Sequence, residues 1–420
     1  MKIFDFIRGL FKSRDKPKDS YYFSGAPFLF GRSISGKTVN ETTALQISAV
    51  FACVKILAES VACLPLHVYQ RNGNNKTLAT QHPLYRILHD AANEEMTAYS
   101  FKETMMLHLL TSGNSYSQLG IGRRGEISGL YPLQSKRMQV ERDDNGKRIY
   151  KYRPTMGENE HMKTPEEITF QSWEILHIPA LGFDGLIGFS PIAMARNAIG
   201  VAIATEEFGA KFFENGARPS GILTHPGTLK NPDALRESWQ SVYGGTDNTG
   251  KVAILEEGMK YESISIPPDD AQFLDTRKFQ IAEIARIFRV PLHMINELDR
   301  ATFSNITQQS LEFITYTLTP WLIRLEQSFN KLLFTQAERE QYFVKFNVDG
   351  FLRGDYETRM RGYSQALQSG ILSVNEVRSL EDLNSIPAEA GGDYHLVNGN
   401  LAKLEDAGAA YQQKAGDKNE

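Results

Sequence analysis

The sequence predicts an α+β chain, and three of its patterns carry that prediction. Between residues 114 and 178, short alternating apolar runs separated by turn residues are typical of antiparallel strands. Long stretches with helical periodicity surround this region. Two of them, 188–216 and 268–289, bracket a small α/β insert at 217–267. This order predicts a stalk of two helices that ends in a knob, and such stalks pack well side by side in rings.

The composition limits the classes of function. A chain of 420 residues suggests roughly two to three structural units. Its 46 Lys and Arg against 50 Asp and Glu give a net charge of −4. Tight DNA binding is excluded, because neutralising phosphates requires a surplus of basic residues. Loose contact with DNA remains compatible with this charge.

The cysteines and the hydropathy indicate synthesis in the cytoplasm and no membrane partner. Cys53 and Cys63 cannot form a disulfide framework, and on one helix they would be separated by about 15 Å of rise. A membrane span needs about 18 consecutive apolar residues, and the longest candidate, 44–66, contains charged residues.

The first 187 residues are predicted to contain an arm, three helices and a β-rich region. Residues 1–41 are expected to form a mobile arm, or alternatively a helix that docks on a partner. A helix from about Thr42 to Cys63 ends at Pro65, and a strand at 66–70 follows it. Further helices are predicted at 82–92 and 99–111, before the strands.

Two long helices are expected next. The first begins with Ser190 as N-cap and Pro191 at the first helical position, and it ends at Asn215-Gly216. Its surface is rich in Ala and Gly, which suits either close approach of another helix or burial in a large core. The second carries Asp269 and Asp270 in its first turn and Arg residues in its last, as the helix dipole favours.

The remaining elements follow in order. Residues 290–304 are predicted to form a loop or broken segment, and a helix over about 305–334 contains Pro320, which should kink it near Tyr316. A strand at 341–349 precedes two short helices, at 354–369 and 373–383. The tail, 395–420, is expected to be mobile.

Two glycine-rich segments resemble phosphate-binding loops. Residues 120–125, G-I-G-R-R-G, precede a predicted strand where a dinucleotide site needs a helix, so a hairpin turn is expected. Residues 245–252, G-T-D-N-T-G-K-V, lack the Ser or Thr that would hold Mg²⁺, because Val252 stands there. The order of helix and strand around this segment is also reversed. A nucleotide-binding enzyme built on 245–252 remains the alternative function.

No other motif points to catalysis, a cofactor or a metal. His82 and His89 could share a helix face, but the sequence places no third ligand near them. The G-x-S-x-G nucleophile motif is absent from the sequence. We therefore expect a chain that is not an enzyme.

The order of the segments resembles the portal proteins of tailed bacteriophages, the common family of long-tailed phages. The resemblance covers about 42–385 and rests on these segments in the family's order: ISAVFACVKILAESVACLPLHVYQ, GNSYSQL, GFSPIAMARNAI, FFENGARPSGIL, GKVAILEEGMKYESISI, DAQFLDTRKFQIAEIARIFRVPLHMI and ATFSNITQQSLEFITYTLTPWL. One departure concerns the segment before the tunnel loop. The family often has Gly-Val-Pro-Pro there, and this chain has Arg289-Val290-Pro291-Leu292.

The resemblance implies an elongated portal subunit and a ring, usually dodecameric, at one capsid vertex. Its parts would be a β-rich wing at 42–187, a first stem helix at 188–216, a small α/β clip at 217–267, a second stem helix at 268–289, a tunnel loop at 290–304, a long kinked wing helix with a strand at 305–353, and a helical crown at 354–394.

The resemblance also implies the partners and the place of action. A portal would nucleate head assembly with the major capsid protein and scaffold, and it would dock the terminase large subunit through its clip. It would pass double-stranded DNA without sequence preference and later bind the head–tail adaptor. Assembly would take place in the host cytoplasm and the product would be part of the virion. A cytoplasmic scaffold without a DNA channel is a further reading.

The residues expected to face DNA follow from this assignment. A duplex that slides should meet few fixed phosphate contacts, since each neutralised phosphate adds affinity. The tunnel-loop candidates carry mixed charges and small polar groups: Asn296, Glu297, Asp299, Arg300, Thr302, Phe303, Ser304 and Asn305. On the first stem helix, Glu206, Glu207 and Glu214 would repel DNA if they face the lumen. Alternatively, they form a solvated face or pair with a neighbouring subunit.

Overall fold

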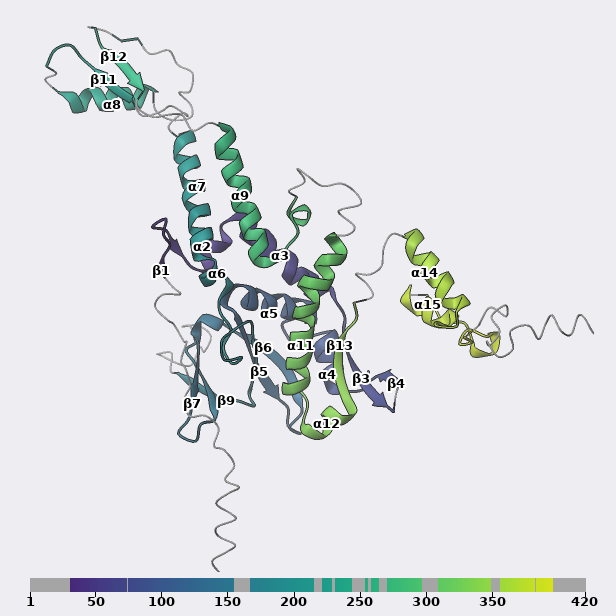
Figure 1. Ribbon diagram of the computed structural model, residues 1–420. Helices are drawn as coiled ribbons and strands as arrows, with labels where there is room; N and C mark the ends of the chain where they lie inside the picture. The colour runs from purple at the N-terminus through teal and green to yellow at the C-terminus, as the bar shows by residue number, and fades with distance from the viewer. Residues whose placement is uncertain are drawn as a thin grey trace, which may run out of the picture. The chain divides into compact units, whose positions relative to one another are not determined.

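The computed structural model describes residues 31–73, 75–154, 167–214, 221–228, 231–243, 254–255, 258–263, 270–296, 309–348, 356–381 and 383–395 (Figure 1). The chain divides into two compact units, Met1–Asn347 and Val348–Glu420. Helices and small antiparallel sheets make up the described part, so the α+β prediction is confirmed. Within that part, none of the helices is long and apolar enough to cross a membrane.

Helix α3 (Ser48–Cys63) is the central helix of the first unit. It packs along α5 (Ala98–Ser112) and buries the apolar positions that its periodicity predicts. The helix expected from Thr42 is divided, because Ile47 adopts an extended conformation between α2 (Glu41–Leu45) and α3. Leu64 is extended before Pro65 and ends α3, as predicted.

Two three-stranded antiparallel sheets form the predicted β-rich region. One has the order β10–β5–β6, with β5 (Asn114–Ile121), β6 (Ile127–Leu133) and β10 (Ile175–Pro179). The other contains β7 (Met138–Arg142), β8 (Arg148–Tyr152) and β9 (Ile168–Gln171) in sequence order. Their facing side chains form one hydrophobic cluster: Tyr116, Val140, Tyr150, Tyr152, Phe170 and Ile175.

A third sheet joins distant parts of the chain. Strand β3 (Leu66–Asn72) pairs with β4 (Asn75–Leu78) on one side and with β13 (Tyr342–Phe346) on the other. In the β13 pairing Val344 lies opposite Val68, and both are buried. Helix α4 (Pro83–His89) packs against β3. The C-terminal part of the first unit is thereby built into its N-terminal sheet.

The two phosphate-loop resemblances have different outcomes. Residues 120–125 run from the end of β5 into the turn of the β5–β6 hairpin. Gly125 has φ +83° there and the Gly122 N–H donates to the Glu126 carbonyl, so the predicted turn is confirmed. The segment 245–252 lies outside the described residues. Helix α8 (Pro232–Tyr243) leads toward it, whereas a P-loop follows a strand.

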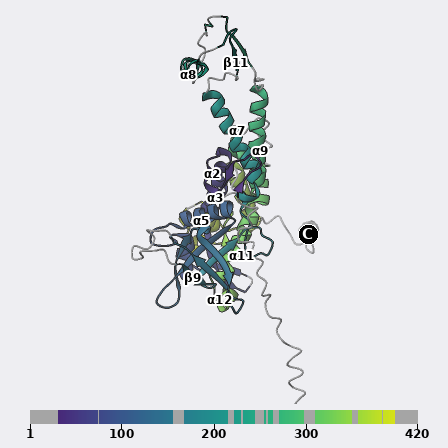
Figure 2. The ribbon, with the colours of Figure 1, turned by 90° about the vertical axis from the view of Figure 1, so that its left-hand side faces the viewer.

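Helices α7 (Arg196–Glu214) and α9 (Asp270–Phe288) are the two long helices expected from the sequence, and they lie against each other (Figures 1 and 2). Ser190 caps the short helix α6 (Pro191–Met194), as predicted, and a one-residue irregularity at Ala195 separates α6 from α7. The stop expected at Asn215-Gly216 lies outside the described residues. Of the insert, the structure describes α8 and two paired strands, β11 (Gly221–Thr224) and β12 (Lys260–Ser263).

The helix predicted to kink near Pro320 contains a π-helical segment immediately before it. Residues Phe313–Leu318 are π-helical, and α11 (Thr319–Leu332) continues from them. The Thr319 N–H bonds to the Ile314 carbonyl, five residues back, which accommodates the donor that Pro320 lacks. The predicted distortion is therefore a change of helical register.

Four further elements lie in the C-terminal part of the described chain. Helix α12 (Gln336–Gln341) was not predicted, although Thr335 and Glu338 form a capping box that marks its start. In the second unit, α14 (Tyr356–Gln368) and α15 (Val374–Leu380) are the two short helices expected there, joined by an Arg359–Glu381 ion pair of 2.8 Å. A short 3₁₀ segment, Ala388–Ala390, follows α15.

Part of the expected N-terminal arm has a defined structure, which corrects the boundary at residue 41. Strands β1 (Gly31–Arg32) and β2 (Thr38–Val39) form a hairpin. The hairpin contacts α7, where Gly200 permits a close approach: a Cβ at Gly200 would lie 2.2 Å from Ser33 Oγ. Contact with a distant helix orders this segment, and local sequence pattern cannot show such a contact.

Candidate functional site

The junction of α3, α7 and α9 contains Glu206, one of the residues expected to face the channel. Ile199 and Ala202 on α7, and Ile284 and Phe288 on α9, are buried. Ala202 and Glu206 line a cavity of about 30 Å³ together with Arg277 and Ile284. Figures 1 and 2 show that the chain runs along α7 to the insert and returns along α9, so the two helices are antiparallel. The small residues of α7 therefore serve, in part, to bring α9 close.

Glu206 is half-buried at this junction. Its side chain lines the small cavity with Arg277 and Gln280 of α9, so it faces the helix partner within its own chain.

Glu207 points to a different neighbour, the β1–β2 hairpin. Its carboxylate forms an ion pair with Lys37 Nζ, and the hydrogen bond from Lys37 lowers the pKa of Glu207. Glu214 is the last residue of α7, and its side chain lies outside the described residues. The structure thus directs Glu206 and Glu207 toward separate partners in the same chain.

Of the tunnel-loop candidates, the structure describes only Asn296. It ends the 3₁₀ turn η3 (Leu292–Ile295) with φ +62°, a left-handed conformation that Asn tolerates well. The other candidates lie outside the described residues: Glu297, Asp299, Arg300, Thr302, Phe303, Ser304 and Asn305.

The residues before and after the tunnel-loop candidates are hydrogen-bonded to each other. His293 Nδ1 lies 2.8 Å from Gln309 Oε1, and the Thr317 hydroxyl donates to the Arg289 carbonyl at 2.8 Å. Arg289 itself has φ +56° where α9 ends. These contacts between 289–296 and the following helix were missed by sequence reasoning, because no local periodicity marks them.

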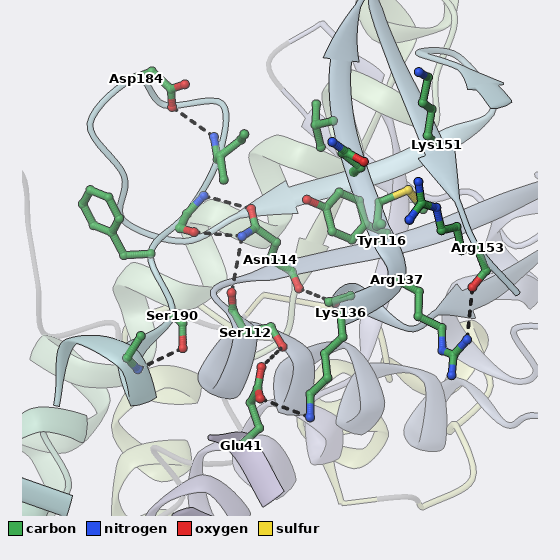
Figure 3. Close-up of a pocket in the computed structure, with 18 of the residues that line it drawn as sticks. Glu41, Ser112, Asn114, Tyr116, Lys136, Arg137, Lys151, Arg153, Asp184 and Ser190 are labelled. Atoms are coloured by element: carbon green, nitrogen blue, oxygen red, sulfur yellow. Dashed lines mark hydrogen bonds and ion pairs between the residues drawn. The ribbon is translucent and has the colours of Figure 1, made fainter. Parts of the chain in front are cut away.

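A larger cavity, of about 760 Å³, lies where the sheets meet the start of α6 (Figure 3). Asn114 connects these parts: its Nδ2 donates to the Gly188 carbonyl and its Oδ1 accepts from the Gly188 N–H, both at 2.8 Å. The Ser190 hydroxyl donates to the Thr111 carbonyl at 2.6 Å. This cavity was not predicted from the sequence.

The basic side chains of the larger cavity have partners within the chain. Lys136 lies 3.1 Å from Glu41, and Lys151 lies 2.8 Å from Glu141. Arg137 donates to the Arg153 carbonyl at 3.3 Å (Figure 3). These paired charges stabilise the cavity walls. We interpret the cavity as a gap in the packing between the sheets and the helices.

A buried histidine lies beside this seam. His177 Nε2 is 3.1 Å from Asn114 Oδ1, which already accepts from Gly188, so Nε2 carries the proton. His177 Nδ1 accepts from the Tyr150 hydroxyl at 3.3 Å. Burial lowers the pKa of His177 to about 3, so the ring is neutral and its role is structural.

Metal binding finds no support in the described part of the chain. There, no group of three or more His, Cys, Asp or Glu side chains is arranged to hold an ion. His82 accepts from the Leu84 N–H and starts α4, while His89 lies 2.7 Å from Asp90. The two histidines thus have separate structural partners.

The sequence places the chain in a structural class of viral protein. It belongs to the phage portal protein family, whose model matches residues 48–382. The resemblance stated from the sequence is therefore confirmed, and the family is one of structural components.

Named relatives and solved structures agree with this assignment. The chain is 38% identical over 373 residues to a probable portal protein of Streptomyces phage phiC31, covering 86% of this chain and 80% of that protein. It is 33% identical over 382 residues to the portal protein of Enterobacteria phage HK97, covering 89% and 87%.

Two solved structures share the fold. An HK97-family phage portal protein from Corynebacterium diphtheriae superposes with a TM-score of 0.55 at 15% identity, over 75% of this chain and 98% of that one. A chain from the neck of a native gene transfer agent particle, computed with C12 symmetry, gives 0.56 at 24% identity, over 81% and 92%.

Proposed function

We propose that this chain is the portal subunit of a tailed phage, and that copies of it form a dodecameric ring at one capsid vertex. Double-stranded DNA would enter the head through the ring during packaging and leave through it during ejection. The observation that carries this proposal is family membership across residues 48–382. The C12 symmetry of the related neck structure supports the subunit number.

We infer the parts of the subunit from their order along the chain. Helices α7 and α9 would be the stem, because they are antiparallel and enclose the insert 217–267, which would be the clip. The sheets and α3 to α5 would belong to the wing, 42–187, together with the kinked helix and strand of 305–353. Residues 290–304 would be the tunnel loop, and α14 and α15 the crown, 354–394.

The charge balance is compatible with DNA that slides. A net charge of −4 provides no surplus of cations for neutralising phosphates. Each phosphate contact that a portal avoids lowers the affinity and therefore the resistance to movement. The tunnel loop would narrow the channel with the mixed charges and small polar groups found between Asn296 and Asn305.

Protein partners would bind at the two ends and around the ring. The clip would dock the terminase large subunit during packaging and the head–tail adaptor afterwards. The major capsid protein and scaffold would meet the ring as head assembly begins in the host cytoplasm, and the finished ring would remain in the virion.

The proposal is tested by assembly and by packaging. Purified full-length chain should form closed rings with a channel wide enough for a duplex, as measured by sedimentation and electron microscopy at several salt concentrations. A chain that stays monomeric under all these conditions contradicts it. Shortening the segment between Asn296 and Asn305 should spare the rings and impair DNA packaging, and normal packaging would refute the tunnel-loop assignment.

A further inference from the structure

The sheet of β13, β3 and β4 has one face in the hydrophobic core and another that is partly open to solvent (Figure 1). Val68 and its partner Val344 are buried on the core side. Because side chains alternate along a strand, Tyr69 and Arg71 lie on the opposite side of β3. The outer face of the sheet therefore consists of these two residues and the residues paired with them.

Four side chains on this outer face come from all three strands. Phe343 of β13 lies opposite Tyr69, and Lys76 of β4 lies opposite Arg71. Directly paired residues of an antiparallel sheet share a face, so the four side chains are neighbours. The two aromatic residues are half-buried, whereas Arg71 and Lys76 are exposed. We name these four residues the basic face.

Stacked rings position the two cations of the basic face. The rings of Tyr69 and Phe343 are stacked, with their centroids 5.4 Å apart. Lys76 Nζ lies 4.8 Å from the centroid of the Tyr69 ring, and Arg71 Cζ lies 4.7 Å from that of Phe343. A cation over an aromatic ring is attracted by the quadrupole of the ring. Two positive charges are thus held over neighbouring rings, and a bound anion would relieve the repulsion between them.

Within the described residues, neither Arg71 nor Lys76 forms a salt bridge with a carboxylate. The three strands themselves contain no Asp or Glu. Lys345 of β13 is exposed and adds a third positive charge. Burial raises the pKa of Glu326 on α11, and the attraction of Lys345 opposes this rise, so Glu326 balances part of the Lys345 charge. The charges of Arg71 and Lys76 are therefore the ones available to a ligand.

The surroundings of the two cations indicate which kind of anion fits. Leu78 lies opposite Tyr69 on β4 and is 51% exposed, so an apolar side chain borders the basic face. Interfaces with nucleic acid neutralise many phosphates and need a larger surplus of basic side chains than this sheet provides. A few cations beside aromatic rings and an exposed leucine instead suit a protein segment that carries both acidic and apolar residues.

We propose that the basic face binds an acidic segment of a partner protein. Carboxylates of the segment pair with the Arg71 guanidinium, which can offer two parallel N–H donors, and with the Lys76 ammonium group. An apolar side chain of the segment packs beside Leu78. This inference does not require the proposed ring, because all residues of the basic face belong to one chain.

Binding of a synthetic acidic peptide to the full-length chain tests the proposal. The probe is a short peptide in which Glu alternates with Leu and Ser, labelled with a neutral fluorophore, and its binding is measured by fluorescence anisotropy at low ionic strength. Arg71→Gln combined with Lys76→Gln should weaken binding about tenfold, because two exposed ion pairs are lost. The same peptide with Gln in place of Glu should not bind.

A matched control removes two cations from another sheet. Arg123 and Arg124 are exposed in the β5–β6 turn, so Arg123→Gln combined with Arg124→Gln changes the net charge equally and should leave peptide binding unchanged. Urea unfolding verifies that both double variants fold like the unchanged protein. Sedimentation measures ring formation separately, so a failure of the proposed function is distinguishable from a failure of this inference.

Three outcomes would overturn the assignment of the basic face. The first is an unchanged protein that does not bind the Glu peptide. The second is an equal loss of binding in the two double variants, since general electrostatic attraction would then explain the result. The third is tighter binding of a single-stranded oligonucleotide of equal charge that is lost in the Arg71/Lys76 variant, because the face would then recognise nucleic acid.

Discussion

The sheets around His177 and the helix pair α7–α9 differ in the surroundings of their side chains. Around His177, buried polar groups are hydrogen-bonded within the same chain, from Tyr150 through His177 to Asn114 and Gly188. On the helix pair, Val201 and Phe279 point to solvent over a well-packed seam. The difference separates a region whose buried polar groups are paired within the chain from one that leaves apolar side chains exposed to solvent.

The largest loss of folding stability is expected from a substitution in the sheet region. Tyr150 is 2% exposed, and its hydroxyl is the partner of His177 Nδ1. Tyr150→Ala should lower the free energy of unfolding by about 4 kcal/mol, because it leaves a cavity and an unpaired buried nitrogen. Urea unfolding measures this loss. Trp173→Ala is the control, since Trp173 is 64% exposed, and a similar loss in both variants would contradict the contrast.

Two alanines on α7, one buried and one half-buried, allow the same comparison within one helix. Ala202 is buried at the junction with α3 and α9, so Ala202→Leu should cost about 2 kcal/mol of folding stability through overpacking. Ala204 is only half-buried on α7, the proposed stem helix, so Ala204→Leu should leave folding stability unchanged and disturb the packing of the proposed ring. Unfolding curves and sedimentation separate the two effects. Equal loss of stability in both variants would refute this division of the helix.

Acid should weaken the sheet region through His177. Its folded pKa of about 3 lies below the ordinary value of 6.5, so the unfolded chain takes up the proton first as the pH falls. Between pH 6.5 and 3 the stabilisation should therefore decrease by about 1.4 kcal/mol per pH unit. His177→Gln should remove this contribution, which unfolding at pH 7 and pH 5 would measure. The same acid sensitivity in both proteins would exclude His177 as its source.

The smallest effect on folding stability is expected from a substitution on the helix pair, where ring assembly should be affected instead. Val201→Glu places a charge on an exposed face, so the stability of the monomer should change by no more than about 0.5 kcal/mol. In the proposed ring we expect this exposed apolar face to meet another copy, so a charge there should reduce ring formation. Sedimentation at matched concentrations measures it, with Leu78→Glu on the exposed strand β4 as control. Unchanged rings in Val201→Glu would show that this face is open in the assembly.

The sequence by itself determined the class of fold, the order of the main elements and the family. Ser190 and Pro191 predict the start of α6, and the six strands from β5 to β10 follow the apolar runs and turns. These signals are local: caps, turns and periodicities act over a few residues, so they can be recognised before any tertiary contact is known.

Only the tertiary structure decided which distant segments meet. The pairing of Val344 with Val68, the ion pair of Lys37 with Glu207 and the bond from Thr317 to Arg289 join residues far apart in sequence or in different elements. The same holds for Glu206 and Glu207, which are adjacent in sequence but face α9 and the hairpin. Successive helical residues point about 100° apart, and only packing determines which neighbour each direction meets.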